Sequence, residues 1–317
     1  MTDVSNKIRE EAGKLLEKGE VDVIIGFEKG SIPLSATPCF IRNEADIEKL
    51  IWNEYCGNNL SLYLSKARGK IGIIAKGCDT RAIVELIKEK QVQRERIVII
   101  GVPCEGMLDR KRIMIRCQSR NITGIEDQGR QLLITGDSLN VAVEKDEFFY
   151  PACQVCANRN PVMCDVFIGN TIEEQKTDEF TDVTDFNEKP SEERWAYITD
   201  EIDRCIRCYA CRNACPLCYC KECFVDATQP QWVGKTIEQS DTLSFHIMRS
   251  IHLAGRCIEC GACERACPVM VDIRKLNRKM SADVKNMFGY KTGLDIDQPA
   301  PLSVFKPDDS EEFILDI

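Results

Sequence analysis

Two runs decide the fold of this chain: Cys205-Ile-Arg-Cys208-Tyr-Ala-Cys211-Arg-Asn-Ala-Cys215-Pro216 and Cys257-Ile-Glu-Cys260-Gly-Ala-Cys263-Glu-Arg-Ala-Cys267-Pro268. Both follow C-x2-C-x2-C-x3-C-P, which is the ligand spacing of paired 4Fe–4S clusters. Three cysteines separated by two residues let one tight loop ligate three iron corners of a cluster. Proline after the fourth cysteine lacks an N–H group and fixes φ, so the chain leaves without crowding the cluster. The sequence therefore predicts two 4Fe–4S clusters.

The fourth cysteine of each run is expected to ligate the cluster of the other run. Site 1 then consists of Cys205, Cys208, Cys211 and Cys267. Site 2 consists of Cys257, Cys260, Cys263 and Cys215. The alternative is structural zinc, whose sites usually show paired C-x2-C knuckles. Two complete copies of the longer pattern favour iron–sulfur clusters over zinc.

Composition and charge exclude several classes of protein. The 317 residues leave room for two domains, and the formal net charge of −9 argues against a surface for nucleic acid or anionic membrane. The N-terminus lacks the apolar core of a signal peptide, and no apolar run approaches the length of a membrane span. We therefore expect the nineteen cysteines to be metal ligands in a reducing cytoplasm rather than disulfides. Only two histidines are present, so histidine chemistry is poorly supplied.

We expect an α+β multidomain chain in which an N-terminal α/β domain precedes an α-helical ferredoxin domain with two 4Fe–4S clusters. The expected boundaries are 1–170 for the α/β domain, 171–200 for an acidic linker, 201–290 for the ferredoxin domain and 291–317 for an acidic tail. A charged helix is the alternative for residues 190–202. In the ferredoxin domain, Leu243, Ile247 and Ile251 recur at helical spacing, and Asp272 is a candidate cap for a later helix.

Two apolar runs in the α/β domain predict neighbouring buried strands. The runs Lys70–Ala75 and Arg96–Val102 are separated by a loop and a helical pattern, which is typical of a parallel strand pair. Each run leads into a loop that carries a cysteine, Cys78 after the first and Cys104 after the second. Ligand sites of open α/β sheets lie at such carboxyl ends of strands. We therefore expect these two cysteines to lie near one site.

A C-x2-C pair, Cys153-Gln-Val-Cys156, follows later in the same domain. Such a pair also occurs in zinc knuckles and redox dithiols, so buried thiols or a redox dithiol remain the alternative. Together with the two loop cysteines, the pair gives four thiolates for one further site. Site 3 is Cys78, Cys104, Cys153 and Cys156, with Cys164 as a possible substitute.

The remaining cysteines have no settled role. Three follow directly after the first run: Cys218, Cys220 and Cys223. They are possible additional ligands, with Cys164 or Cys56 as a fourth, or small apolar groups that pack near the clusters, as free cysteine commonly does. We expect three others to be core residues: Cys39, Cys56 and Cys117. Both histidines, His246 and His252, are expected to pack on a helix rather than to ligate metal.

Residues 205–290 resemble the helical ferredoxin domains of the C subunit of heterodisulfide reductase and of the iron–sulfur subunits of succinate dehydrogenase. The phrase Leu253-Ala-Gly-Arg-Cys257-Ile-Glu-Cys260-Gly-Ala-Cys263 carries that likeness. The resemblance covers about ninety residues and implies helices around two clusters.

Residues 70–170 look like the β subunit family of deazaflavin (coenzyme F-420)-reducing hydrogenase and formate dehydrogenase. Three pieces carry the likeness: Lys76-Gly-Cys78-Asp79-Thr-Arg-Ala82, Ile99-Ile-Gly-Val-Pro-Cys104-Glu-Gly106, and Cys153-Gln-Val-Cys156 with the later Asp165-Val-Phe-Ile-Gly169. Such subunits carry an iron–sulfur cluster and a flavin and exchange electrons with deazaflavin. The resemblance therefore implies a third 4Fe–4S cluster at site 3. After Gly169 the chain turns acidic and departs from the family's pattern, so FAD is a possible cofactor that we expect the isolated chain to lack.

These features favour an iron–sulfur electron-transfer subunit of a soluble anaerobic oxidoreductase complex of the hydrogenase, formate dehydrogenase or heterodisulfide reductase type. It would relay single electrons between a flavin or other redox partner and a catalytic subunit, and its partners would be the other subunits of that complex. One alternative is a flavin-containing oxidoreductase that itself oxidises deazaflavin or NAD(P)H, although no G-x-G-x-x-G motif is present. A lesser alternative is a zinc-stabilised scaffold.

Overall fold

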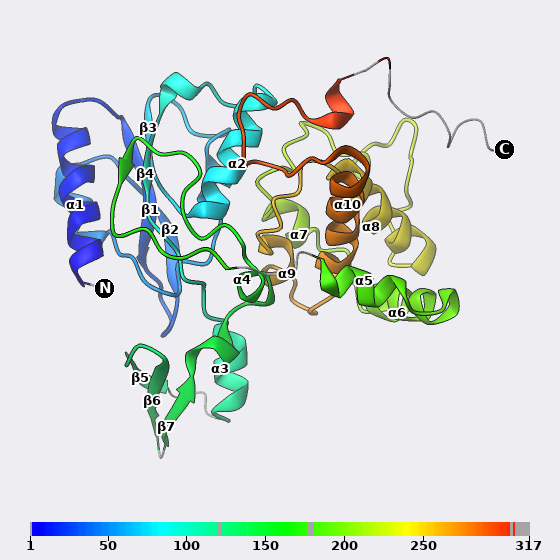
Figure 1. Ribbon diagram of the computed structural model, residues 1–317, viewed down its shortest axis with the longest axis horizontal. Coiled ribbons are helices and arrows are strands. Elements are labelled where there is room, and N and C mark those ends of the chain that lie inside the picture. Colours follow the sequence, from blue (N-terminus) through cyan, green and yellow to red (C-terminus); the bar gives the residue numbers. More distant parts are fainter. Residues whose placement is uncertain (1, 119–121, 138, 176–179, 305–306, 308–317) are drawn as a thin grey trace.

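A computed structural model describes residues 2–118, 122–137, 139–175, 180–304 and 307 of the chain. It has an α/β part and a helical part side by side, and a small second sheet extends from the α/β part (Figure 1). The central sheet contains β1 (Val23–Lys29), β2 (Ala36–Ile41), β3 (Ile71–Ala75), β4 (Ile97–Gly101) and β8 (Val166–Phe167). Within the described residues, no helix combines the length and the apolar composition that crossing a membrane requires.

The central sheet has the order β2-β1-β3-β4-β8. β1 and β2 are antiparallel, and the other neighbours are parallel. β3 and β4 pair from Ile71 opposite Ile97 to Ala75 opposite Gly101, which confirms the predicted parallel pair. Every residue of β3 is buried, as expected for a parallel strand that is covered on both faces. Helices α1 (Thr2–Glu17) and α2 (Gly77–Lys88) flank the sheet on opposite sides (Figure 1).

The small second sheet is antiparallel and has the order β5-β6-β7. Its strands are β5 (Ile122–Asp127), β6 (Gln131–Gly136) and β7 (Leu139–Glu144), and the helix α3 (Arg110–Arg116) precedes them. Its own core is built around the fully buried side chains of Ile113 and Ile134. Buried Lys145 ties it to the α/β part, because its ammonium pairs with Asp127 at 2.8 Å and with Glu54 at 3.2 Å.

The helical part contains six helices within the described residues. They are α5 (Thr181–Asn187), α6 (Ser191–Asp203), α7 (Ala210–Asn213), α8 (Gln239–His252), α9 (Ala262–Arg265) and α10 (Ile273–Phe288). α8 packs against α10, and the short helices α7 and α9 each follow one cysteine loop. The Asp272 carboxylate accepts a hydrogen bond from the Lys275 N–H group at 3.2 Å, which confirms the predicted cap of α10.

Helix α8 turns polar residues inward. Ile247 and Ile251, which were predicted on its apolar face, are 38% and 49% exposed, whereas His246 and Arg249 are buried. The predicted apolar face is therefore wrong. The physical reason is that the inward face of α8 meets the cysteine loops, where His246 contacts the Cys205 sulfur and Arg249 donates to the Cys211 carbonyl oxygen.

The expected acidic linker contains α5 and most of α6. In α5, the Asp182 carboxylate accepts hydrogen bonds from the Arg278 guanidinium, the shortest at 2.7 Å. In α6, the Tyr197 hydroxyl donates to the Asp272 carboxylate at 2.8 Å. The alternative of a charged helix at residues 190–202 thus agrees with α6. Asp182 and Tyr197 thus anchor this segment to α10 and to its cap.

The chain returns to the α/β part after α10, where it runs beside α2 (Figure 1). The Tyr290 hydroxyl and the Gly293 N–H group both donate to the buried carboxylate of Glu85, each at 2.8 Å. The Arg81 guanidinium donates to the Thr292 carbonyl oxygen at 2.8 Å. The start of the expected tail is therefore docked on α2, and its end at residues 308–317 lies outside the described residues.

Candidate cluster sites

The two cysteine loops of the helical part share one backbone path. Arg207 and Tyr209 have left-handed φ values of 50° and 59°, and the matching positions of the second loop, Glu259 and Gly261, have 59° and 68°. Left-handed residues in such loops turn successive N–H groups toward a common anion-binding concavity. A cluster held by thiolates is such an anionic group.

Site 1 brings Cys267 from the second run beside cysteines of the first run. Burial raises the pKa of the Cys205 thiol, and the nearby Cys267 and Cys208 thiols raise it further. Burial also raises the pKa of Cys211 to about 12. The Cys205 sulfur accepts from the Arg207 N–H group at 3.4 Å and lies 3.3 Å from the His246 Nε2 atom.

Site 2 brings Cys215 from the first run beside cysteines of the second run. Burial raises the pKa of Cys257, Cys260 and Cys263, to about 11 for Cys260, and the nearby Cys215 thiol adds to each shift. The amide of Asn277 donates to the Cys263 sulfur at 3.6 Å. The thiol of Cys263 also raises the pKa of Cys211, so the two sites lie close together, and the crossed assignment stays a prediction.

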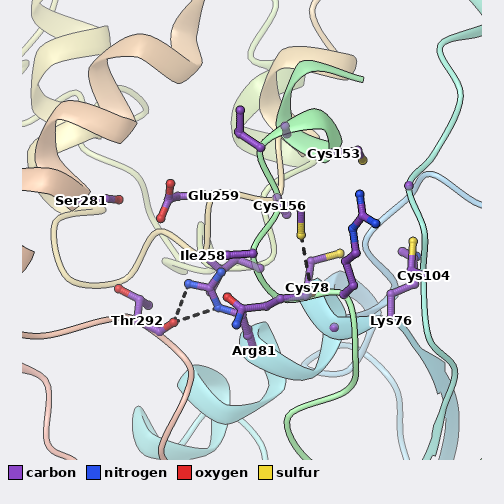
Figure 2. A pocket seen from close by; sticks show the side chains of 18 of the residues that line it. Lys76, Cys78, Arg81, Cys104, Cys153, Cys156, Ile258, Glu259, Ser281 and Thr292 are labelled. Atoms are coloured by element: carbon purple, nitrogen blue, oxygen red, sulfur yellow. Dashed lines mark hydrogen bonds between the residues drawn. The ribbon is translucent and has the colours of Figure 1, made fainter. Parts of the chain in front are cut away.

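The four cysteines of site 3 line one cavity at the carboxyl ends of β3 and β4 (Figure 2). Cys78 lies in the first turn of α2, Cys104 follows β4, and Cys153 lies in the short helix α4 (Pro151–Gln154). Burial raises the pKa of Cys104, and the thiols of Cys153 and Cys156 raise it further. The strand-end loops thus bring the two distant cysteines to the C-x2-C pair.

Residues of the helical part close the same cavity, which the sequence did not predict. Ile258, Cys260 and Arg265 line it opposite the α/β part. The Arg265 guanidinium donates to the Cys260 carbonyl oxygen at 2.6 Å and to the Gly57 carbonyl oxygen at 2.7 Å. Site 3 therefore borders site 2, and Cys260 is among the thiols that raise the pKa of Cys78.

Cys164, the possible substitute ligand, is not among the described residues that line the cavity. It packs instead against β4, where its Cβ atom would lie 2.8 Å from a Cβ atom added to Gly101. The structure therefore does not bring it into site 3.

The three cysteines that follow the first run do not gather into one group. A hydrogen bond from the Cys215 thiol lowers the pKa of Cys218, Cys220 is exposed, and Cys223 packs near site 1. The predicted core cysteines are buried: Cys39, Cys56 and Cys117. His252 packs edge-on against Phe224 with ring centroids 5.2 Å apart, as expected. His246 packs in the core but also contacts a site 1 sulfur, which the sequence did not predict.

The donor chemistry of the three sites fits 4Fe–4S clusters. Buried thiols with raised pKa values stay protonated unless a metal supplies positive charge, and iron then holds them as thiolates. Among the described residues, no three Cys, His, Asp or Glu side chains converge as ligands of a single metal ion. A cubane instead takes its four thiolates at four separate iron corners, so it does not require such convergence.

A buried ion pair holds the first turn of α2, next to site 3, in place. The Lys76 ammonium, 2% exposed, pairs with the fully buried Asp79 carboxylate at 2.9 Å. It also donates to the carbonyl oxygens of Cys56 and Asn58 at 3.0 and 2.9 Å. The same carboxylate accepts from the Leu60 N–H group at 2.8 Å. This pair joins the first turn of α2, which carries a site 3 cysteine, to the preceding loops.

We expect Asp79→Asn to destabilise the α/β part strongly, because it leaves the Lys76 charge buried without a counterion. Removing one partner of a buried pair typically costs about 3–5 kcal/mol. That corresponds to a fall of at least about 6 °C in the thermal unfolding midpoint, followed by circular dichroism under anaerobic conditions. Asp3→Asn, which breaks an exposed pair with Lys7, is the matched control and should leave the midpoint unchanged. Equal midpoints for both variants would contradict the structural role.

Comparisons with known proteins agree with this division of the chain. Residues 68–198 match the family model for the C terminus of the coenzyme F420 hydrogenase/dehydrogenase beta subunit. Residues 204–272 match the model of a 4Fe–4S dicluster domain. The first match reaches residue 198, so the predicted departure from the family after Gly169 is wrong.

Two curated relatives are similar over most of their length. The chain is 25% identical to the F420-dependent formate dehydrogenase subunit beta of Methanocaldococcus jannaschii, in an alignment of 350 positions that covers 90% of each chain. It is 24% identical to the F420-dependent formate dehydrogenase 1 subunit beta of Methanococcus maripaludis, covering 91% of this chain and 90% of that one. A chain of the F420-reducing NiFe hydrogenase complex from Methanosarcina barkeri aligns with a TM-score of 0.38 and 17% identity, over 50% of this chain and 63% of that chain.

Fold, cysteine sites and comparisons together define an α+β iron–sulfur protein with a 4Fe–4S domain. More particularly, a region that matches the beta-subunit model of the coenzyme F420 hydrogenase/dehydrogenase family precedes a region that matches the model of a 4Fe–4S dicluster domain. The resemblance to the heterodisulfide reductase C subunit stays a prediction.

Proposed function

We propose that this chain is the iron–sulfur electron-transfer subunit of an oxidoreductase complex of the hydrogenase or formate dehydrogenase type. It would carry three 4Fe–4S clusters in a line, at sites 3, 2 and 1, and work in a reducing cytoplasm. The observation that carries the proposal is the contact between neighbouring sites. Sites 3 and 2 border one cavity, and the thiol of Cys263 in site 2 is close enough to raise the pKa of Cys211 in site 1.

The first step of the line lies between the α/β part and the helical part. Cys78 of site 3 and Cys260 of site 2 line the same cavity, so no separate domain lies between the two sites. The Arg256 guanidinium holds the two parts together, since it binds the Glu89 carboxylate through two hydrogen bonds of 2.6 and 2.9 Å. A bidentate pair of this kind fixes geometry as well as adding binding energy.

The second step lies within the helical part and ends at the surface. The thiol of Cys263 in site 2 is among the neighbours that raise the pKa of Cys211 in site 1. Cys208 of site 1 is exposed, and the adjacent Ile206 is 53% exposed. Site 1 is thus the end at which a partner subunit would exchange single electrons, and site 3 is the other end.

Both curated relatives support a partner of this type, because they are named as beta subunits of F420-dependent formate dehydrogenases. They also favour a second candidate function, a flavin-containing oxidoreductase that itself oxidises deazaflavin or NAD(P)H. A bound flavin would split a hydride into single electrons for the clusters. Stoichiometric flavin in the purified chain, together with turnover by the chain alone, would favour this second candidate.

Iron analysis of the anaerobically purified full chain tests the proposal. We expect about twelve irons and about twelve acid-labile sulfides per chain, because three cubanes each hold four of both. A count of about eight irons per chain would mean that site 3 holds no cluster, because two cubanes account for that number. Zinc without iron would overturn the proposed function altogether and support the scaffold alternative.

A further inference from the structure

Arg249 of α8 lies where the two sites of the helical part meet. It is 3% exposed, and its Nη2 atom donates to the carbonyl oxygen of Cys211 at 3.3 Å. Burial lowers the pKa of Arg249, but four nearby thiols raise it; they come from sites 1 and 2 and the segment after the first run, namely Cys263, Cys218, Cys215 and Cys211. One guanidinium therefore adjoins ligands of both sites.

No carboxylate forms an ion pair with Arg249 among the residues that the structure describes, and its Nε and Nη1 atoms have no hydrogen-bond partner there. Other buried arginines of the helical part differ. Arg278 pairs with Asp182 at 2.7 Å and with Glu259 at 2.5 Å. Arg207 donates to the Gly234 carbonyl oxygen at 2.7 Å and has the Asp241 carboxylate at 3.8 Å.

A buried guanidinium without a counterion is unfavourable, because its charge has lost its hydration. The thiolates of two neighbouring clusters would supply the missing negative charge. The unpaired Nε and Nη1 atoms are consistent with hydrogen bonds to cluster or thiolate sulfur. Arg249 also hydrogen-bonds the Cys218 thiol and lowers its pKa, and the clusters would supply the rest of the compensating negative charge.

We propose that Arg249 is a positioning residue whose fixed charge raises the reduction potentials of the clusters at sites 1 and 2. Reduction adds one negative charge to a cluster, and a nearby buried positive charge stabilises that reduced form. The cluster at site 3 lies beyond site 2, so its potential should change less. The inference rests on the proposed function, since it requires that the sites hold clusters.

The test is a potentiometric titration of the full chain, followed by electron paramagnetic resonance under anaerobic conditions, after iron analysis has established the clusters in the parent. Arg249→Gln should shift the ratio of oxidised to reduced cluster at a fixed potential at least tenfold at sites 1 and 2. For a one-electron couple that equals about 59 mV toward lower potential. Arg249→Lys, which keeps the charge, should restore most of the parent potential.

Arg212→Gln is the matched control, because Arg212 follows Cys211 directly but is 22% exposed and pairs with Asp226 at 2.7 Å. Its shift should be well below that of Arg249→Gln. Parent-like potentials in Arg249→Gln would overturn the proposal. Arg249→Gln could also lose its clusters. In that case, clusters that are retained with parent-like potentials in Arg249→Lys would support the role of the charge. Loss of the clusters in both variants would overturn the proposal. Absence of clusters in the parent is a different result and counts against the proposed function.

Discussion

Replacing Cys267 by alanine is expected to empty site 1 and to leave site 2 filled, although Cys267 belongs to the second run. Its thiol is 6% exposed and lies beside Cys205, whose pKa it raises. Its sulfur accepts from the Val271 N–H group at 3.3 Å. A cubane that loses one of four thiolates in a buried site is left with an open iron corner, so we expect about four irons to be lost.

Double variants identify which cluster has gone, because two changes in one site do not add. Cys267→Ala combined with Cys205→Ala should lose about four irons, the same as either single change. Cys267→Ala combined with Cys257→Ala should lose about eight. Cys117→Ala, at a buried cysteine of the small second sheet, is the control and should lose none. The opposite pattern of the two double variants would refute crossed ligation.

The parts of the fold that were predicted correctly depend on local sequence. The parallel β3–β4 pair follows from two short apolar runs around a helix, and the cap of α10 follows from Asp272. Site 3 was harder, and it rested on the rule that strand ends gather at one edge of a sheet.

The features that the sequence did not predict depend on how the α/β part and the helical part of the chain pack together. Arg81 and Thr292 are far apart in sequence, and no pattern in either segment predicts their hydrogen bond. The same docking closes the cavity of site 3 with Ile258 and Arg265. The acidic residues of α5 were predicted to belong to a linker, because the partner of Asp182, Arg278, lies in another helix and cannot be recognised from the local sequence.

Helix α8 shows a different reason for failure. Hydrophobic periodicity assumes that the buried face of a helix is apolar. Here the buried face includes His246 and Arg249, which adjoin cysteine sulfurs or carbonyl groups, while Ile247 and Ile251 are exposed. A histidine and an arginine three residues apart on one helix, next to a cysteine-rich segment, were the available signal.

Replacing Cys104 or Cys153 by alanine is expected to remove the cluster of site 3 alone. These residues come from different elements, yet both line the cavity with Cys78 and Cys156 (Figure 2). Each variant should lose about four irons and keep about eight, since sites 1 and 2 have their own ligands. The full chain must be used, because Ile258 and other residues of the helical part close the cavity.

Cys164→Ala is the decisive control for site 3, because Cys164 lies in the same part of the chain but packs against Gly101 of β4. It should keep all of the iron. Electron transfer from a reduced partner at site 1 to an acceptor at site 3 should stop in Cys104→Ala and continue in Cys164→Ala, because only the first variant interrupts the line of clusters. Full iron content in Cys104→Ala, or loss of iron in Cys164→Ala, would show that the ligands of site 3 are assigned wrongly, and the line would then have to end at site 2.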